Sequence, residues 1–105
     1  MFIDNLENMD ISPDDYLKKA RKIAKSHGYF GDLEFSTRKN KKLMYDHNGK
    51  YIHFGGADNM DFILHKMTNN PNANERRELY HKRASKLAEQ SDKYSPSKLS
   101  LLILW

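Results

Sequence analysis

The sequence contains no cysteine, so the chain can form neither a disulfide framework nor a metal site with thiolate ligands. It also lacks an apolar run long enough to cross a bilayer, and we therefore expect no membrane partner. Glycine and proline are scarce, at five and three residues, and neither internal repeats nor low-complexity linkers divide the chain. These absences predict one small domain over residues 1–105, with residues 1–11 as a loosely docked lead-in.

Basic and acidic residues are distributed unevenly along the chain. Hydrophobic residues make up 38% and charged residues 30% of the sequence, which is typical of a folded soluble protein, and the formal net charge is +4. Residues 1–15 carry acidic charges only, whereas residues 16–50 carry ten basic residues against three acidic ones. This basic stretch favours a polyanionic partner such as nucleic acid, although a lysine-rich face that serves solubility alone explains it equally well.

A ββα unit is predicted over residues 42–67. Asn48-Gly49 separates two strand-like runs and indicates a hairpin over residues 42–54, because a type I′ turn needs positive φ at both central residues. Asn59 is expected to cap the helix that follows. Residues 33–36 alternate between apolar and polar and predict a third strand beside the hairpin.

Capping residues mark the helix boundaries. Ser12-Pro13 and Ser95-Pro96 each place a serine before a proline at the first helical position, and Gly28 is expected to end the first helix. Asn74 is expected to cap a helix with an apolar stripe of Leu79, Tyr80, Ala84, Leu87 and Ala88. The predicted fold class is α+β, with a small antiparallel sheet of two or three strands centred on the hairpin and covered by helices over residues 13–27, 59–67, 75–90 and 96–104.

The segment over residues 96–104 is apolar nearly all round its predicted helix, and Trp105 follows it. A surface helix carries only one apolar face. We therefore expect this tail to be buried on both sides, either between the sheet and helix 75–90 of its own chain or in the core of a homodimer. Packing within the chain is preferred, because so small a domain needs these side chains for its own core.

Basic side chains that could neutralise phosphates gather on helix 13–27, on the loop at residues 37–42 and on helix 75–90. Arg76 and Arg77 fall in the first turn of their helix, where the macrodipole disfavours cations. An anion should therefore lie nearby, and Glu75, Glu78 or Asp61 is preferred over an external phosphate. The candidate nucleic-acid contacts are Lys18, Lys19, Arg21, Lys22, Lys25, Arg38, Lys39, Lys41, Lys42, Lys50, Arg76, Arg77, Lys82 and Lys86.

No set of side chains indicates catalysis or metal binding. His53, His65 and His81 lie on different predicted elements and lack the short spacing of zinc ligands. Asp61 and His65 are one helical turn apart, which predicts a surface pair rather than a catalytic dyad. We therefore expect no catalytic residues, no metal and no cofactor.

The ββα order is similar to that of His-metal finger nucleases, with Asp46-His47 near a strand end and His65 on the following helix. In those enzymes a longer loop separates the two strands, whereas Asn48-Gly49 closes the hairpin here at once. Tyr45 and Tyr51 likewise lie too close together for the motif of a GIY-YIG nuclease. Both comparisons disfavour a nuclease.

Several short motifs occur in a recognisable order along the chain. They are Ser12-Pro13-x-x-Tyr16-Leu17-Lys18-Lys19-Ala20, Lys41-Lys42-Leu43-Met44-Tyr45, Asn48-Gly49-Lys50, His53-Phe54-Gly55, Asp61-Phe62, His65-Lys66, Glu75-Arg76-Arg77 with Tyr80 and Arg83, and the apolar tail that ends at Trp105. This order resembles a family of small basic proteins of nucleocytoplasmic large DNA viruses, such as marseillevirus-like and iridovirus-like viruses. The resemblance covers residues 12–105, and the longer loop at residues 68–74 departs from the family pattern.

The resemblance implies a viral protein without established enzymatic activity, located in the virion or in the cytoplasm or nucleus of the host. Together with the charge, it predicts a non-catalytic protein that binds nucleic acid, DNA more readily than RNA, through the phosphate backbone. The alternative is a structural or interaction module, in which the apolar tail and the acidic N-terminal segment contact another viral or host protein and the basic face serves solubility alone. A contiguous basic face would favour the first prediction, and scattered lysines would favour the second.

Overall fold

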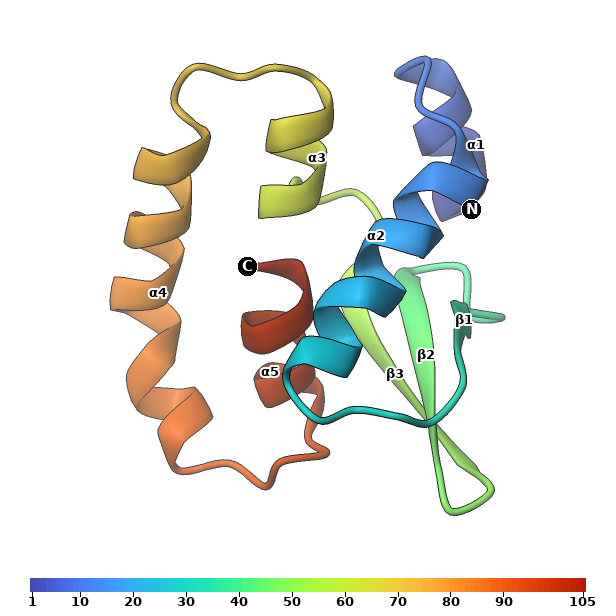
Figure 1. The fold of residues 1–105 in the computed structure, drawn as a ribbon, viewed down its shortest axis with the longest axis vertical. Coiled ribbons are helices and arrows are strands. Elements are labelled where there is room, and N and C mark those ends of the chain that lie inside the picture. Colours follow the sequence, from blue (N-terminus) through green and yellow to red (C-terminus); the bar gives the residue numbers. More distant parts are fainter.

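The chain folds into a three-stranded antiparallel sheet with helices arranged around it (Figure 1). The computed structural model describes all of residues 1–105. The predicted α+β class is therefore confirmed. In chain order the elements are α1 (Phe2–Asn8), α2 (Pro13–Ser26), β1 (Leu33–Phe35), β2 (Lys41–His47), β3 (Lys50–Gly56), α3 (Phe62–Met67), α4 (Ala73–Glu89), α5 (Pro96–Leu99) and the π-helical segment η1 (Ser100–Leu104).

The hairpin of β2 and β3 forms the centre of the sheet as predicted. Asn48 and Gly49 have φ values of 54° and 84°, as a type I′ turn requires. Leu43 faces Phe54 across the hairpin, and β1 adds to the other side of β2 in the order β1-β2-β3. The predicted third strand is therefore also present. Within the sheet, Leu43 and Phe54 are fully buried, and they point to the face that the helices cover.

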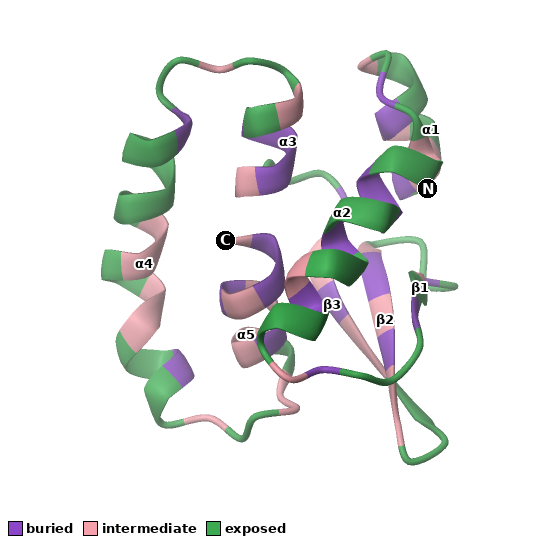
Figure 2. Cartoon of the chain, viewed as in Figure 1, coloured by how far each residue is buried: buried purple, intermediate pink, exposed green.

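Helix α2 and the segment α5–η1 cover this face of the sheet (Figures 1 and 2). Tyr16 and Ala20 of α2 are completely buried, and so is Leu99 of α5. The predicted tail lies between the sheet and α4, where Ile103 is 1% exposed. Packing of the tail within its own chain is thus confirmed, and its helix changes from α to π geometry at Ser100.

The N-terminal lead-in and the start of α3 differ from the predictions. Residues 2–8 form helix α1, whose Phe2 and Leu6 are 3% and 0% exposed, so the lead-in is firmly rather than loosely docked. The Phe2 ring packs edge-on against Tyr16 with 5.0 Å between centroids. Helix α3 begins at Phe62 because Asp61, not Asn59, is its N-cap and accepts a hydrogen bond from the Leu64 amide.

Helix α4 contacts the rest of the fold less closely than its sequence predicts. It begins after Asn72 rather than Asn74, and only Ala73 and Ala88 are buried (Figure 2). Leu79 and Leu87 of the predicted apolar stripe are 46% and 63% exposed, so the stripe is largely open. Neither α4, the longest helix, nor any other helix combines the length and apolar character needed to cross a membrane.

The side chain of Trp105 lies beside the middle of α4. Tyr80, in the middle of α4, stacks on the Trp105 ring with 4.4 Å between centroids and 6° between planes. The indole thus contacts the middle of α4 through an aromatic ring rather than through the leucine side chains of the predicted stripe. Helix α4 is held at its two ends by alanines and at its centre by this aromatic pair.

Candidate functional site

The exposed side of α2 carries the densest group of unpaired cations in the fold. Ser12 accepts a hydrogen bond from the Asp15 amide and fixes the start of this helix. Lys18, Lys22 and Lys25 follow at helical spacing, are all exposed, and have no carboxylate within 4.0 Å. Lys19 is exposed beside them. We call Lys18, Lys19, Lys22 and Lys25 the α2 basic group.

Arg21 differs from its neighbours on α2 because it already has a partner within the chain. One guanidinium nitrogen lies 2.8 Å from the Glu34 carboxylate, and Nε donates to the carbonyl of Leu33 at 2.9 Å. The side chain thus ties α2 to β1. Its guanidinium is 44% exposed, so the ion pair with Glu34 is screened by water and contributes little stability.

The other predicted phosphate contacts lie at separate places in the fold (Figure 1). Arg38 and Lys39 are exposed in the β1–β2 turn, and Lys41, which begins β2, is half-buried. Lys50 is exposed at the hairpin turn, and Lys82 and Lys86 are exposed on α4. The predicted bases are therefore not all gathered on one face. The set on α2 is contiguous, which favours nucleic-acid binding, whereas the scatter of the others favours the alternative of an interaction module.

Lys42 was predicted to contact phosphate, and that prediction is wrong. Its side chain is 1% exposed, and Nζ lies 2.7 Å from the Asp61 carboxylate. The ammonium also lies over the Phe2 ring, 5.3 Å from its centroid. Burial lowers the pKa of Lys42, while the Asp61 charge opposes this shift. The residue is a structural cation because a polyanion outside the fold cannot displace its buried partner.

Asp61 is the centre of a buried polar network and does not form the predicted surface pair with His65. One carboxylate oxygen accepts from Tyr16 Oη and from Lys42 Nζ, both at 2.7 Å, and the other accepts from the Leu64 amide. Burial raises the pKa of Tyr16 well above its usual value, and the Asp61 charge adds to the rise. The network joins α2, β2 and the start of α3.

His65 is a buried residue of α3, next to Asp61 and Asn70. Burial lowers its pKa; the Asp61 charge opposes that shift, and Arg76 and Lys42 reinforce it. The Asn70 side-chain amide donates to His65 Nδ1 at 2.9 Å, so the hydrogen of the neutral ring lies on Nε2.

The paired arginines at the start of α4 do not contact the acids that were preferred as their partners. Arg77 Nε donates to the backbone oxygen of Trp105 at 2.7 Å, and its guanidinium lies over the Phe62 ring. Arg76 has no carboxylate within 4.0 Å. The expectation of an acidic partner within the fold is therefore wrong for both residues.

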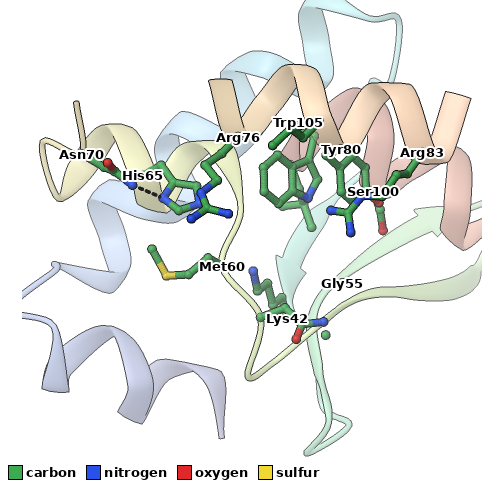
Figure 3. Close-up of a pocket in the computed structure, with 14 residues that line it drawn as sticks. Lys42, Gly55, Met60, His65, Asn70, Arg76, Tyr80, Arg83, Ser100 and Trp105 are labelled. Carbon is green, nitrogen blue, oxygen red and sulfur yellow. Dashed lines mark hydrogen bonds between the residues drawn. The ribbon is translucent and has the colours of Figure 1, made fainter. Parts of the chain in front are cut away.

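Arg76 lines a pocket of about 800 Å³ between α4, the α3 end, η1 and β3 (Figure 3). Its basic side chains are Arg76 and Arg83 of α4, with Lys42 at the base. Tyr80 and Trp105 form an aromatic wall. No aspartate or glutamate lines it, so the pocket has a net positive charge.

Gly55 shapes the base of this pocket. Its φ of +79° is a left-handed conformation that side chains disfavour, and an added Cβ would lie 2.7 Å from Leu104 and 3.3 Å from Lys42. The strand can therefore approach η1 only with glycine at this position. Gly55 therefore forms part of the base of the pocket, which side chains of α4 also line.

The three histidines considered as zinc ligands are not brought together. His53 is hydrogen-bonded to Ser36 and His65 to Asn70, and no group of three or more histidine, aspartate or glutamate side chains could hold a metal ion. His47, considered for a nuclease, stacks on Tyr94 with 3.6 Å between ring centroids. The pocket beside α4 thus offers positive charge and aromatic surface.

The pocket was not predicted from the sequence, although the sequence contains one signal for it. Arg76, Tyr80 and Arg83 recur at helical spacing on one face of α4, and no acid stands three or four residues from either arginine. The rest of the pocket comes from distant segments, so its presence depended on the tertiary fold.

Comparison of the chain with family models, with curated protein sequences and with solved structures yields no match.

Proposed function

We propose that this protein binds nucleic acid through the phosphate backbone, with the α2 basic group as the principal contact, and that it catalyses no reaction. The observation that carries the proposal is the absence of acidic partners for Lys18, Lys22 and Lys25, although all three share one exposed face. Unpaired lysines on one face neutralise phosphates and displace the cations condensed on nucleic acid, and the release of these cations favours binding. Contacts of this kind position a protein without reading base sequence.

Exposed bases elsewhere would add to the same interaction. Arg38 and Lys39 lie in the β1–β2 turn and are free of acidic partners within 4.0 Å. From the resemblance to small basic proteins of large DNA viruses, we further propose that the protein binds DNA in preference to RNA and acts in the virion or in the host cytoplasm or nucleus. Both statements belong to the proposal, as does the absence of catalysis.

The alternative, a structural or interaction module, takes second place. It requires an apolar tail that can contact another protein, yet Leu101, Ile103 and Leu104 are 7%, 1% and 2% exposed within their own chain. The acidic residues near the N-terminus, such as Asp14 and Asp15, are exposed, so they remain free to contact another protein as that alternative requires.

Replacing Lys18, Lys22 and Lys25 together by glutamate is expected to weaken binding to duplex DNA of unrelated sequences strongly. For the parent, the logarithm of the binding constant should fall linearly with the logarithm of salt concentration, and losing three phosphate contacts should reduce that slope by about 3. Fluorescence anisotropy over a salt series measures both quantities. DNA recovered after incubation with Mg²⁺ should be intact.

The matched control changes Lys50, Lys82 and Lys86 to glutamate, which alters the net charge equally at other places in the fold. This control should lose less affinity and less of the slope than the α2 variant, because its lysines lie outside the principal contact. Equal losses in the two variants would show that overall charge, not α2, is responsible. Absence of binding by the parent at low salt would overturn the proposed function, provided that circular dichroism shows each protein folded.

A further inference from the structure

The pocket beside α4 is separate from the α2 basic group and has a different chemical character. The α2 group is an exposed row of lysines, whereas the pocket is concave, and its volume of about 800 Å³ is within the range of small-molecule sites. Its wall combines two arginines with two aromatic rings. This combination suits a ligand that carries both negative charge and a planar apolar part.

Both arginines of the pocket have unused hydrogen-bonding capacity. Neither Arg76 nor Arg83 makes a side-chain hydrogen bond or an ion pair within the chain. Lys82 and Lys86 on the same helix also form no ion pair, but neither of them lines the pocket. Figure 3 shows Arg76 and Arg83 extending from α4 to the same space, on either side of the aromatic rings. A planar guanidinium binds phosphate through two parallel hydrogen bonds.

The aromatic wall is rigid and only partly covered. Tyr80 and Trp105 are stacked on each other and both remain partly exposed. The indole N–H of Trp105, the hydroxyl of Tyr80 and the hydroxyl of Ser100 donate to no group in the chain. Met60 and Leu79 add exposed apolar surface at the rim, at 38% and 46%. A flat heterocycle with polar edges would find both stacking surface and hydrogen-bond partners here.

We propose that this pocket binds a nucleoside phosphate, with the phosphate held by Arg76 and Arg83 and the base placed against the Tyr80–Trp105 wall. The ligand is either a free mononucleotide or the unpaired terminal nucleotide of a strand, and only the second form rests on the proposed nucleic-acid binding. Inorganic phosphate alone would leave the aromatic wall without a partner. A neutral nucleoside would leave the two guanidinium groups without one.

Trp105 allows the proposal to be tested directly, because it is the only tryptophan in the chain and forms part of the wall. Titration with AMP is expected to quench its fluorescence in a saturable manner, and calorimetry should give the same dissociation constant. Adenosine and inorganic phosphate should each bind more weakly than AMP. A single-stranded oligonucleotide with a 5′-phosphate, compared with the same strand without it, distinguishes the strand end from the free nucleotide.

Changing Arg76 and Arg83 together to glutamine is expected to weaken AMP binding by about tenfold or more, since charge-assisted hydrogen bonds to phosphate are lost. Both side chains are exposed and unbonded within the chain, so the variant should unfold at the same temperature as the parent. The matched control changes Lys82 and Lys86 to glutamine on the same helix and should bind AMP as the parent does. The variant with Lys18, Lys22 and Lys25 changed to glutamate should also retain AMP binding.

These variants separate failure of the pocket from failure of the α2 interface. Retained AMP binding by the α2 variant, with loss in the arginine variant, supports the pocket even if duplex DNA does not bind. Absence of AMP binding at millimolar concentration, equal loss in the Lys82 and Lys86 control, or equal affinity for inorganic phosphate would each overturn the proposal. Tighter binding of phosphotyrosine than of any nucleotide would also overturn it, in favour of a phosphopeptide.

Discussion

Replacing Asp61 by asparagine is expected to lower the free energy of unfolding by about 3–5 kcal/mol, because it leaves a buried cation without its counter-charge. Lys42 and Asp61 are 1% and 0% exposed, and Nζ lies 2.7 Å from the carboxylate. Asparagine has nearly the same size and also caps helices well, so the substitution removes mainly the charge. Urea unfolding followed by circular dichroism measures the loss, which is large for a domain of this length.

The control for this prediction is a double variant. Changing Lys42 to methionine as well as Asp61 to asparagine removes the charge of both partners, and it should recover most of the stability that the single change loses. With its oxygen kept on the Leu64 amide, the asparagine places its NH2 group toward Tyr16 Oη, and this hydroxyl then accepts a hydrogen bond instead of donating one. A loss below about 1 kcal/mol in the single variant would contradict the prediction and show that water reaches the ammonium.

Deleting residues 101–105 is expected to abolish cooperative unfolding. Leu101, Ile103 and Leu104 are at most 7% exposed, and removing a buried leucine or isoleucine side chain costs about 2–5 kcal/mol each. Their sum is comparable to the whole stability of a small domain. The deletion also removes Trp105, on which Tyr80 stacks, so α4 would lose its central contact. Thermal unfolding by circular dichroism and mass by light scattering provide the measurements.

An exposed leucine supplies the comparison for the deletion. Leu87 is 63% exposed, and its change to alanine should alter the free energy of unfolding by no more than about 0.5 kcal/mol. If the deleted chain still unfolds cooperatively, the tail is not part of the core. A parent dimer that becomes a folded monomer on deletion would show instead that the tail is an interface between copies.

Features that depend on a few neighbouring residues could be predicted from the sequence. The Asn48-Gly49 turn, the Ser12 and Ser95 caps and the C-terminal Gly28 of α2, with φ of +84°, all occur as expected. Each is fixed by backbone geometry that only certain residues adopt, so no tertiary contact is needed to recognise it.

Features that depend on distant partners could not be predicted in this way. Asp61 looked like a surface residue because His65 stands one turn away, yet its true partners, Lys42 and Tyr16, are 19 and 45 residues distant. The pocket is similar, since Arg83 and Trp105 are brought together only when η1 inserts between α4 and the sheet. The exposed lysines of α2 were found because an amphipathic pattern alone shows them.

Few buried side chains attach α4 to the rest of the fold, and this affects the dynamics of the native state. Amide hydrogens exchange with solvent through local openings, whose free energy is low where few apolar contacts must be broken. Helix α4 has only Ala73 and Ala88 buried, so it should open as a unit and exchange much sooner than β2 and β3. Such openings widen the mouth of the pocket without disturbing the sheet. A ligand that holds Arg76 and Arg83 against β3 should therefore slow exchange in α4 specifically.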